Sequence, residues 1–205
     1  MAEAPRVGRV KRAFEATLGA DGAVRLHTAL VRRAGRWADA ASGGRVFVAF
    51  AGGDAESEGD VAALMPAGAR LFAQRGDGRD RFANAFADAW EQHRGPIAVI
   101  GTDQPALGAP HAWGAADDLR DGVDVCFGPA TAGGWYLLAA ARPPDAVLAI
   151  EPGPEAMTAA LRIAVESGLS IGWLRSERDL ETPADAAALL ADPCAPADVV
   201  KALRA

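Results

Sequence analysis

Acidic and small polar residues stand directly after three apolar runs of this 205-residue chain. They are Thr102 and Asp103 after the run at 96–101, Thr131 to Gly134 after 124–128, and Asp179 and Glu181 after 170–175. If these runs are parallel strands, their carboxyl ends form the edge at which open α/β sheets bind ligands. Carboxylates gathered there suit Mg²⁺ or Mn²⁺, with water and substrate phosphates completing the coordination shell.

Each of these features also has a purely structural interpretation. Asp103 is placed to cap a turn, which is a common role for aspartate. The carboxylates of Asp179 and Glu181 stand just ahead of a predicted helix and can cap it instead. Gly133 and Gly134 provide either a tight turn or a close approach of the backbone to a ligand. The spacing alone leaves both interpretations open.

The N-terminal segment combines positive charge with flexible backbone. Arg9 and Lys11 lie beside Gly8 ahead of a predicted helix, and such a combination suits a diphosphate. Over residues 1–36 there are eight Arg or Lys and three acids, so this segment carries +5 and the rest of the chain −11. The asymmetry predicts that the segment meets an anionic partner, and a solvated basic helix face is the alternative.

Length and composition favour a single domain. At about 100–200 residues per domain, we expect a single domain over 1–205. The net charge of −6 argues against a nucleic-acid binder. No apolar run reaches the ~18 residues of a membrane span, and no apolar stretch of a secretory signal follows the basic N-terminus. We therefore expect a cytoplasmic protein whose two cysteines, Cys126 and Cys194, are free thiols.

Short apolar runs alternate with stretches of helical periodicity along the chain. The expected strands are 45–53, 69–74, 96–103, 124–128, 134–141 and 170–175. The expected helices are 21–41 with Asp21 as N-cap, 59–65, 79–93, 110–121, 143–150, 154–167, and one that begins at Pro183 with Thr182 as cap. The alternation predicts an α/β fold in three layers, a mostly parallel sheet with helices on both faces.

Two expectations describe how this sheet is packed. The continuous apolar runs 96–101 and 124–128 should form neighbouring interior strands. Phe82, Phe86 and Trp90 recur every fourth residue and should pack the helix over 79–93 onto the sheet.

Five blocks, taken in order, carry a resemblance to a known family. They are AEAPRVGRVKRAFEATLG (2–19), QRGDGRDRF (74–82), IGTDQPAL (100–107), GPATAGGWYL (128–137) and DLETPAD (179–185). Together they resemble a bacterial family of nucleotide-diphospho-sugar transferases with a GT-A-like fold, described as glycosyltransferases and related to small nucleotidylyltransferases. The block around Asp103 is the best preserved of the five.

The resemblance implies roles for individual residues. Asp103 would be the principal catalytic carboxylate and a metal ligand, with Asp179 and Glu181 near the same Mg²⁺ or Mn²⁺ ion and Lys11 on the oxygens of the diphosphate. The remaining residues implied in substrate binding are Arg9, Gln74, Asp77, Arg81, Thr102, Gly133 and Gly134. A divalent ion at such a site neutralises the charge that develops on the leaving group.

The chain also departs from the family pattern. An apolar strand precedes the first block in the family, whereas here Met1 stands where that strand should be ending, so we expect a start further upstream or a rearranged sheet. Ala13 and Ala132 replace polar family residues, and Gln104 replaces a cysteine.

The sequence is compatible with three functions. The first is a metal-dependent glycosyltransferase that uses a nucleotide-activated substrate. The second is a catalytically reduced relative that binds a nucleotide or a protein. The third is a nucleotidylyltransferase that joins an NTP to a small phosphorylated acceptor.

Overall fold

Helix α1 (Glu15–Ser42) is the longest helix of the structure, a computed structural model that describes residues 1–76, 78–150 and 153–205. It belongs to the first of two units, formed by Met1–Ala73, Gly101–Leu107 and Arg178–Ala205. The second unit is formed by Gln74–Ile100 and Gly108–Glu177. Whether residues 1–205 act as one domain stays a prediction.

Helix α1 begins earlier than its apolar pattern predicted. Phe14, not Asp21, is the residue that precedes its first turn, and the helix passes through a kink at Gly19, where φ is 71° and ψ is 167°. A residue with a Cβ would be strained in that conformation. Leu26, Leu30 and Val31 are buried, so the predicted apolar stripe is the face that packs.

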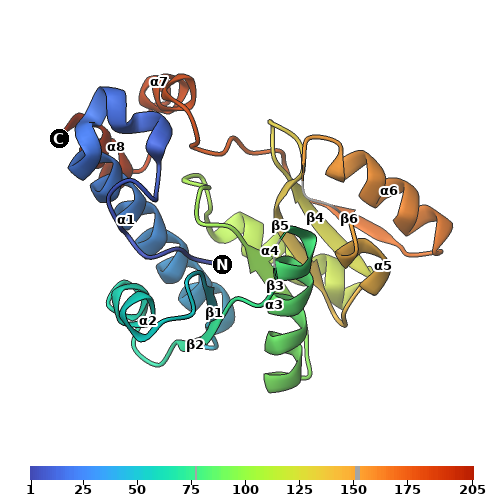
Figure 1. The fold of residues 1–205 in the computed structure, drawn as a ribbon. Coiled ribbons are helices and arrows are strands. Elements are labelled where there is room, and N and C mark those ends of the chain that lie inside the picture. The colour runs from blue at the N-terminus through green and yellow to red at the C-terminus, as the bar shows by residue number, and fades with distance from the viewer. Residues whose placement is uncertain (77, 151–152) are drawn as a thin grey trace. The chain divides into compact units, whose positions relative to one another are not determined.

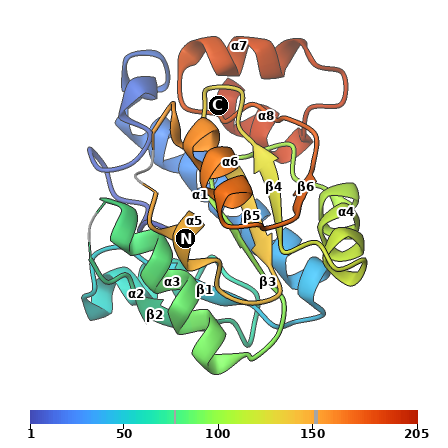
Figure 2. The same cartoon turned by 90° about the vertical axis from the view of Figure 1, so that its right-hand side faces the viewer.

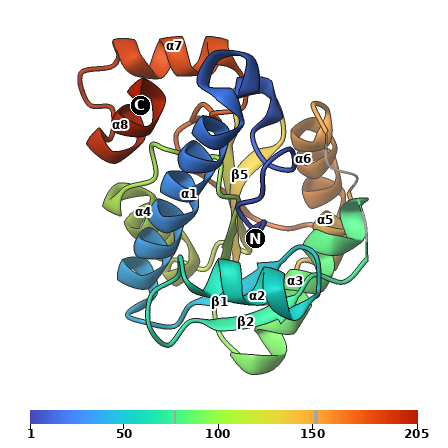
Figure 3. The same ribbon diagram turned by 60° about the vertical axis from the view of Figure 1, so that its left-hand side comes forward.

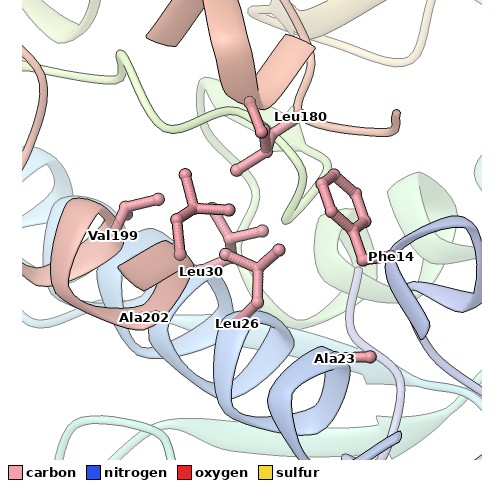
Figure 4. Close-up of a cluster of buried hydrophobic side chains, with 9 residues drawn as sticks. Phe14, Ala23, Leu26, Leu30, Leu180, Val199 and Ala202 are labelled. Atoms are coloured by element: carbon pink, nitrogen blue, oxygen red, sulfur yellow. The ribbon is translucent and has the colours of Figure 1, made fainter. Parts of the chain in front are cut away.

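One hydrophobic core of the first unit lies against this stripe. The short helix η1 (Arg12–Phe14), α7 (Pro183–Ala191) and α8 (Ala197–Arg204) surround it (Figure 3). Figure 4 shows Phe14 and Leu180 facing Leu26 and Leu30 in this cluster. Helix α7 begins at Pro183 as predicted, because Thr182 accepts a hydrogen bond from the Asp185 N–H at 3.3 Å and donates its own N–H to the Asp185 carboxylate at 2.8 Å.

A two-stranded parallel sheet forms the other part of this unit. Strand β1 (Phe47–Phe50) pairs with β2 (Arg70–Ala73), and α2 (Ala55–Ala62) connects them (Figure 3). Helix α2 starts before the predicted residue 59 because Asp54 caps it, accepting the Ser57 N–H at 2.8 Å. Ala2 forms a parallel bridge to Phe50, which ties the N-terminal segment to the carboxyl end of β1.

The second unit contains a four-stranded mixed sheet in the order β3-β5-β4-β6. Its strands are β3 (Ile97–Ile100), β4 (Val125–Pro129), β5 (Trp135–Ala140) and β6 (Ile171–Trp173). Strand β5 runs antiparallel to both β3 and β4, whereas β4 and β6 are parallel. The prediction that β3 and β4 are neighbours is wrong, because β5 returns from β4 through a short turn and inserts between them.

Helices cover both faces of this sheet, which confirms the α/β class. Helix α4 (Ala109–Arg120) lies on one face, and α5 (Asp145–Leu148) and α6 (Ala156–Glu166) lie on the other (Figures 1 and 2). In α3 (Gly78–Gln92), Phe86 is buried as predicted, and the Phe82 ring meets the edge of Trp135 with centroids 6.0 Å apart.

Two further expectations concern the cysteines and membrane spans. Both cysteines are free, as predicted, and the structure places Cys126 in the interior and Cys194 at the surface. No helix within the described residues combines the length and the apolar character needed to cross a bilayer.

Candidate functional site

Lys11 has an unusual backbone conformation. Its φ of 48° and ψ of 39° lie in the left-handed region, and among the described residues it is the only non-glycine with a positive φ. A non-glycine residue held in this region costs on the order of 1–3 kcal/mol and persists only where surrounding contacts enforce it. Such strain is concentrated at functional sites, so the contacts of Lys11 define the candidate site.

The Lys11 ammonium joins two segments of the first unit. Its Nζ lies 2.6 Å from the Asp103 Oδ1 and 2.6 Å from the Leu180 carbonyl oxygen. The lysine side chain is 6% exposed, whereas the Asp103 side chain is 40% exposed. The ammonium is therefore buried behind a carboxylate that still faces solvent.

The loop 101–107 that carries Asp103 is fixed by contacts to its backbone. The Leu180 N–H donates to the Asp103 carbonyl oxygen at 2.8 Å. From α1, the Arg33 guanidinium donates to the carbonyl oxygens of Pro105 at 2.6 Å and Leu107 at 3.4 Å. These bonds hold the loop in one conformation without using the Asp103 side chain.

A second carboxylate lies close to the first. The Asp179 Oδ1 accepts a hydrogen bond from the Gln104 Nε2 at 3.1 Å. Burial, together with the negative charges of Glu181 and Asp103, raises the pKa of Asp179 to about 6, although Lys11 opposes the shift. Asp103, Asp179 and Glu181, called the carboxylate cluster below, thus hold more negative charge than Lys11 alone balances.

The carboxylate cluster fits a divalent cation only in an open arrangement. Among the described residues, no group of three or more His, Cys, Asp or Glu side chains is close enough to hold a metal ion by itself. Mg²⁺ is commonly bound by one or two carboxylates while substrate phosphates and water supply the other oxygens. Asp103 and Asp179 offer such hard oxygen ligands, so they suit an ion that arrives with a phosphorylated substrate.

His27 supports the segment that leads to Lys11 and was not predicted from the sequence. Its Nε2–H donates to the Glu3 carbonyl oxygen at 2.9 Å, and its side chain is buried on α1. Burial lowers its pKa, so the ring is neutral near pH 7. Its place beside Leu26 on the apolar stripe was the signal that could have placed it in the core.

Gln104 was also missed as a site residue. It is buried in the loop 101–107, and its partner Asp179 is 75 residues further along the chain. The only hint in the sequence was that it stands where the similar family has a cysteine.

The other predicted residues of the first unit are less involved. Thr102 is half-buried in the loop 101–107. Arg9 is exposed, and its side chain has no ion pair among the described residues. Its neighbour Arg6 is committed to carboxylates of the α2 region, with ion pairs to Asp54, Glu56 and Asp60.

The remaining predicted residues are in the second unit or outside the described residues. Gln74, Arg81, Gly133 and Gly134 belong to the second unit, and Asp77 is not among the described residues. Gly133 has a φ of 101°, and a Cβ there would lie 2.5 Å from the Pro154 carbonyl oxygen. Its glycine is thus required by the close approach of another backbone segment, and the ligand contact stays a prediction.

Comparison with known proteins gives the fold and a family. The chain is similar to a solved structure from Desulfovibrio desulfuricans G20 described as a "putative nucleotide-diphospho-sugar transferase", with 21% identity, a TM-score of 0.88, and coverage of 99% of this chain and 91% of that one. No curated protein matches the chain. The profile of the DUF2064 family, described as "Uncharacterized protein conserved in bacteria", matches residues 36–151. Since this is more than half of its length, the chain belongs to the DUF2064 family.

Proposed function

We propose that this protein is a metal-dependent transferase that acts on a nucleotide-activated substrate, with a sugar nucleotide as the donor. The observation that carries the proposal is the meeting of Lys11, Asp103 and Asp179 in one unit, with negative charge in excess. The solved neighbour, whose description names nucleotide-diphospho-sugars, supports the choice of substrate class.

In this proposal the acidic and the basic residues have separate roles in binding the diphosphate. Asp103 and Asp179 would hold Mg²⁺ or Mn²⁺, which when bound neutralises charge on the leaving diphosphate. Lys11 and the exposed Arg9 would bring positive charge to the phosphate oxygens. The bonds from Leu180 and Arg33 hold the backbone that carries Asp103, so the loop 101–107 itself needs little reorganisation when the substrate enters.

Calorimetric titration of nucleoside diphosphates with and without Mg²⁺ tests the proposal. The wild type should bind at least one of them only in the presence of Mg²⁺, and Asp103→Asn should weaken that binding by about tenfold or more. Asp121→Asn, at an exposed aspartate after α4, is the matched control and should bind as the wild type does. Equal binding by the wild type and Asp103→Asn would reduce Asp103 to a turn residue.

The same protein samples then test turnover. Transfer from a sugar nucleotide that depends on Asp103 would support the transferase. Tight Mg²⁺-dependent binding with no transfer to any acceptor would instead favour the non-catalytic, nucleotide-binding alternative.

A further inference from the structure

We infer that Gln104 is a positioning residue, whose side-chain amide orients the Asp179 carboxylate for binding of the metal–diphosphate substrate. This inference rests on the proposed function of the carboxylate cluster. It assigns the task to a residue that does not itself touch the substrate.

The hydrogen bonds of Gln104 determine which way its amide faces. Gln104 is 3% exposed, so its polar atoms are shielded from bulk solvent. Its Oε1 accepts the Ala106 N–H at 3.3 Å, and a backbone N–H can only donate. The NH₂ group must therefore face the Asp179 Oδ1, which it meets at 3.1 Å as a donor to a carboxylate.

The backbone around Gln104 is also held by contacts other than the one from its own Oε1 to the Ala106 N–H. Arg33 holds the carbonyl oxygens on either side of Ala106, and the Leu180 N–H binds the Asp103 carbonyl oxygen. The Leu180 side chain is itself buried in the core shown in Figure 4. Both segments are thus anchored. The hydrogen bond from the Gln104 amide then fixes the side chain of Asp179 between them.

Asp179 needs such a bond because its neighbours repel it. Glu181 and Asp103 are both negative and close enough to act on its carboxylate. Without a donor, like-charge repulsion would turn the Asp179 carboxylate away from Asp103. Gln104 supplies that donor without adding a charge, so the cluster keeps its full negative charge for a cation.

A double-mutant cycle separates positioning from a merely structural role. Gln104→Met keeps the length of the side chain and removes both the donor to Asp179 and the Oε1 acceptor of the Ala106 N–H. Asp179→Ala removes the carboxylate acceptor, so the cycle isolates the bond between the two side chains. Calorimetry of a Mg²⁺–nucleoside diphosphate should show binding about tenfold weaker for Gln104→Met, as for loss of a hydrogen bond to a charged group. In the Asp179→Ala background the same change should alter binding less than about twofold. Gln92→Met, at an exposed glutamine of α3, is the control.

A second measurement does not need the nucleotide. In the free protein, the side-chain amide resonances of Gln104, identified by their loss in Gln104→Met, should shift in Asp179→Ala, whereas those of Gln92 should stay. Gln104→Glu is the substitute if the methionine variant does not fold. It should weaken binding at least as much, because its carboxylate would repel those of Asp103 and Asp179.

The outcomes distinguish the two proposals. A wild type that binds no nucleotide overturns the proposed function, and the positioning role with it. A wild type that binds, together with equal effects of Gln104→Met in both backgrounds, overturns the positioning role alone. Side-chain amide resonances of Gln104 that do not shift in Asp179→Ala also overturn the positioning role.

Discussion

The Lys11 ammonium and the Asp103 carboxylate form an ion pair of 2.6 Å in which the lysine is buried and the aspartate is half-exposed. The pair has a consequence for cation binding. Any metal ion that uses Asp103 must compete with an ammonium already bound to one of its oxygens. The same lysine would be released toward phosphate oxygens once the ion has taken its place.

Lys11→Met should therefore have opposite effects on two ligands. Binding of Mn²⁺ alone, followed by electron paramagnetic resonance, should become several-fold tighter because the competing charge is gone. Binding of a Mg²⁺–nucleoside diphosphate should weaken by about tenfold because a phosphate contact is lost. Lys201→Met, at the exposed lysine of α8, should change neither. Weaker binding of Mn²⁺ by Lys11→Met would show that the lysine does not compete with the ion.

The raised pKa of Asp179 predicts a pH dependence of stability. Its pKa is about 6 in the folded protein and about 3.8 as its ordinary value. The folded state thus holds a proton that the unfolded state has released, so this contribution to stability is present below pH ~4 and is lost as the pH rises toward ~6. The Asp179→Asn variant has no carboxyl group at this position, so its stability lacks this pH-dependent contribution.

Urea unfolding at pH 5 and pH 7.5 without metal checks this expectation. Between these two pH values the wild type should lose about 1 kcal/mol more than Asp179→Asn, because part of the effect of the shift is already lost at pH 5 and the side chain is partly solvated. Asp121→Asn should follow the wild type. Parallel pH dependence of the wild type and Asp179→Asn would show that Asp179 is an ordinary solvated carboxylate.

Most elements of the fold could be predicted from the sequence, but their pairing could not. The expected strand over 134–141 became β5 at 135–140 because its apolar run is clear. Yet β3, β4 and β5 are all apolar runs of similar length, and nothing in such a run states which strand lies beside it. The turn at Thr131–Gly134 makes β5 a neighbour of β4, and the pairing of β3 with the free edge of β5 then separates β3 from β4.

Some residues of the candidate site could likewise be predicted from the sequence, and others could not. Asp103 and Asp179 could be named because each follows an apolar run, and Lys11 because it lies near Gly8 in a basic segment. Gln104 and His27 could not, since each is a single buried polar residue whose role depends on a partner distant in the sequence. Their partners, the Asp179 carboxylate and the Glu3 carbonyl oxygen, become apparent only once the chain is folded.

Phe86 tests the buried face of α3. Its side chain is 0% exposed, so Phe86→Ala should reduce the free energy of unfolding by about 3–5 kcal/mol. Trp113→Ala removes an aromatic side chain that is exposed on α4 and should cost less than about 0.5 kcal/mol. Denaturant unfolding of the two variants measures both values. A loss below about 1 kcal/mol for Phe86→Ala would mean that this face of α3 is not packed in solution.

His27 gives a pH dependence of the opposite sign to that of Asp179. Burial lowers its pKa from the ordinary value of 6.5, so the unfolded state takes up a proton that the folded state does not. Its contribution to stability is therefore present above pH ~6.5 and is lost as the pH falls below that value.

His27→Gln keeps a donor for the Glu3 carbonyl oxygen but does not titrate. Between pH 7.5 and pH 5.5, the free energy of unfolding should fall less for His27→Gln than for the wild type, and His93→Gln should follow the wild type. An unchanged pH profile in His27→Gln would mean that the His27 ring is already accessible to protons in the folded protein.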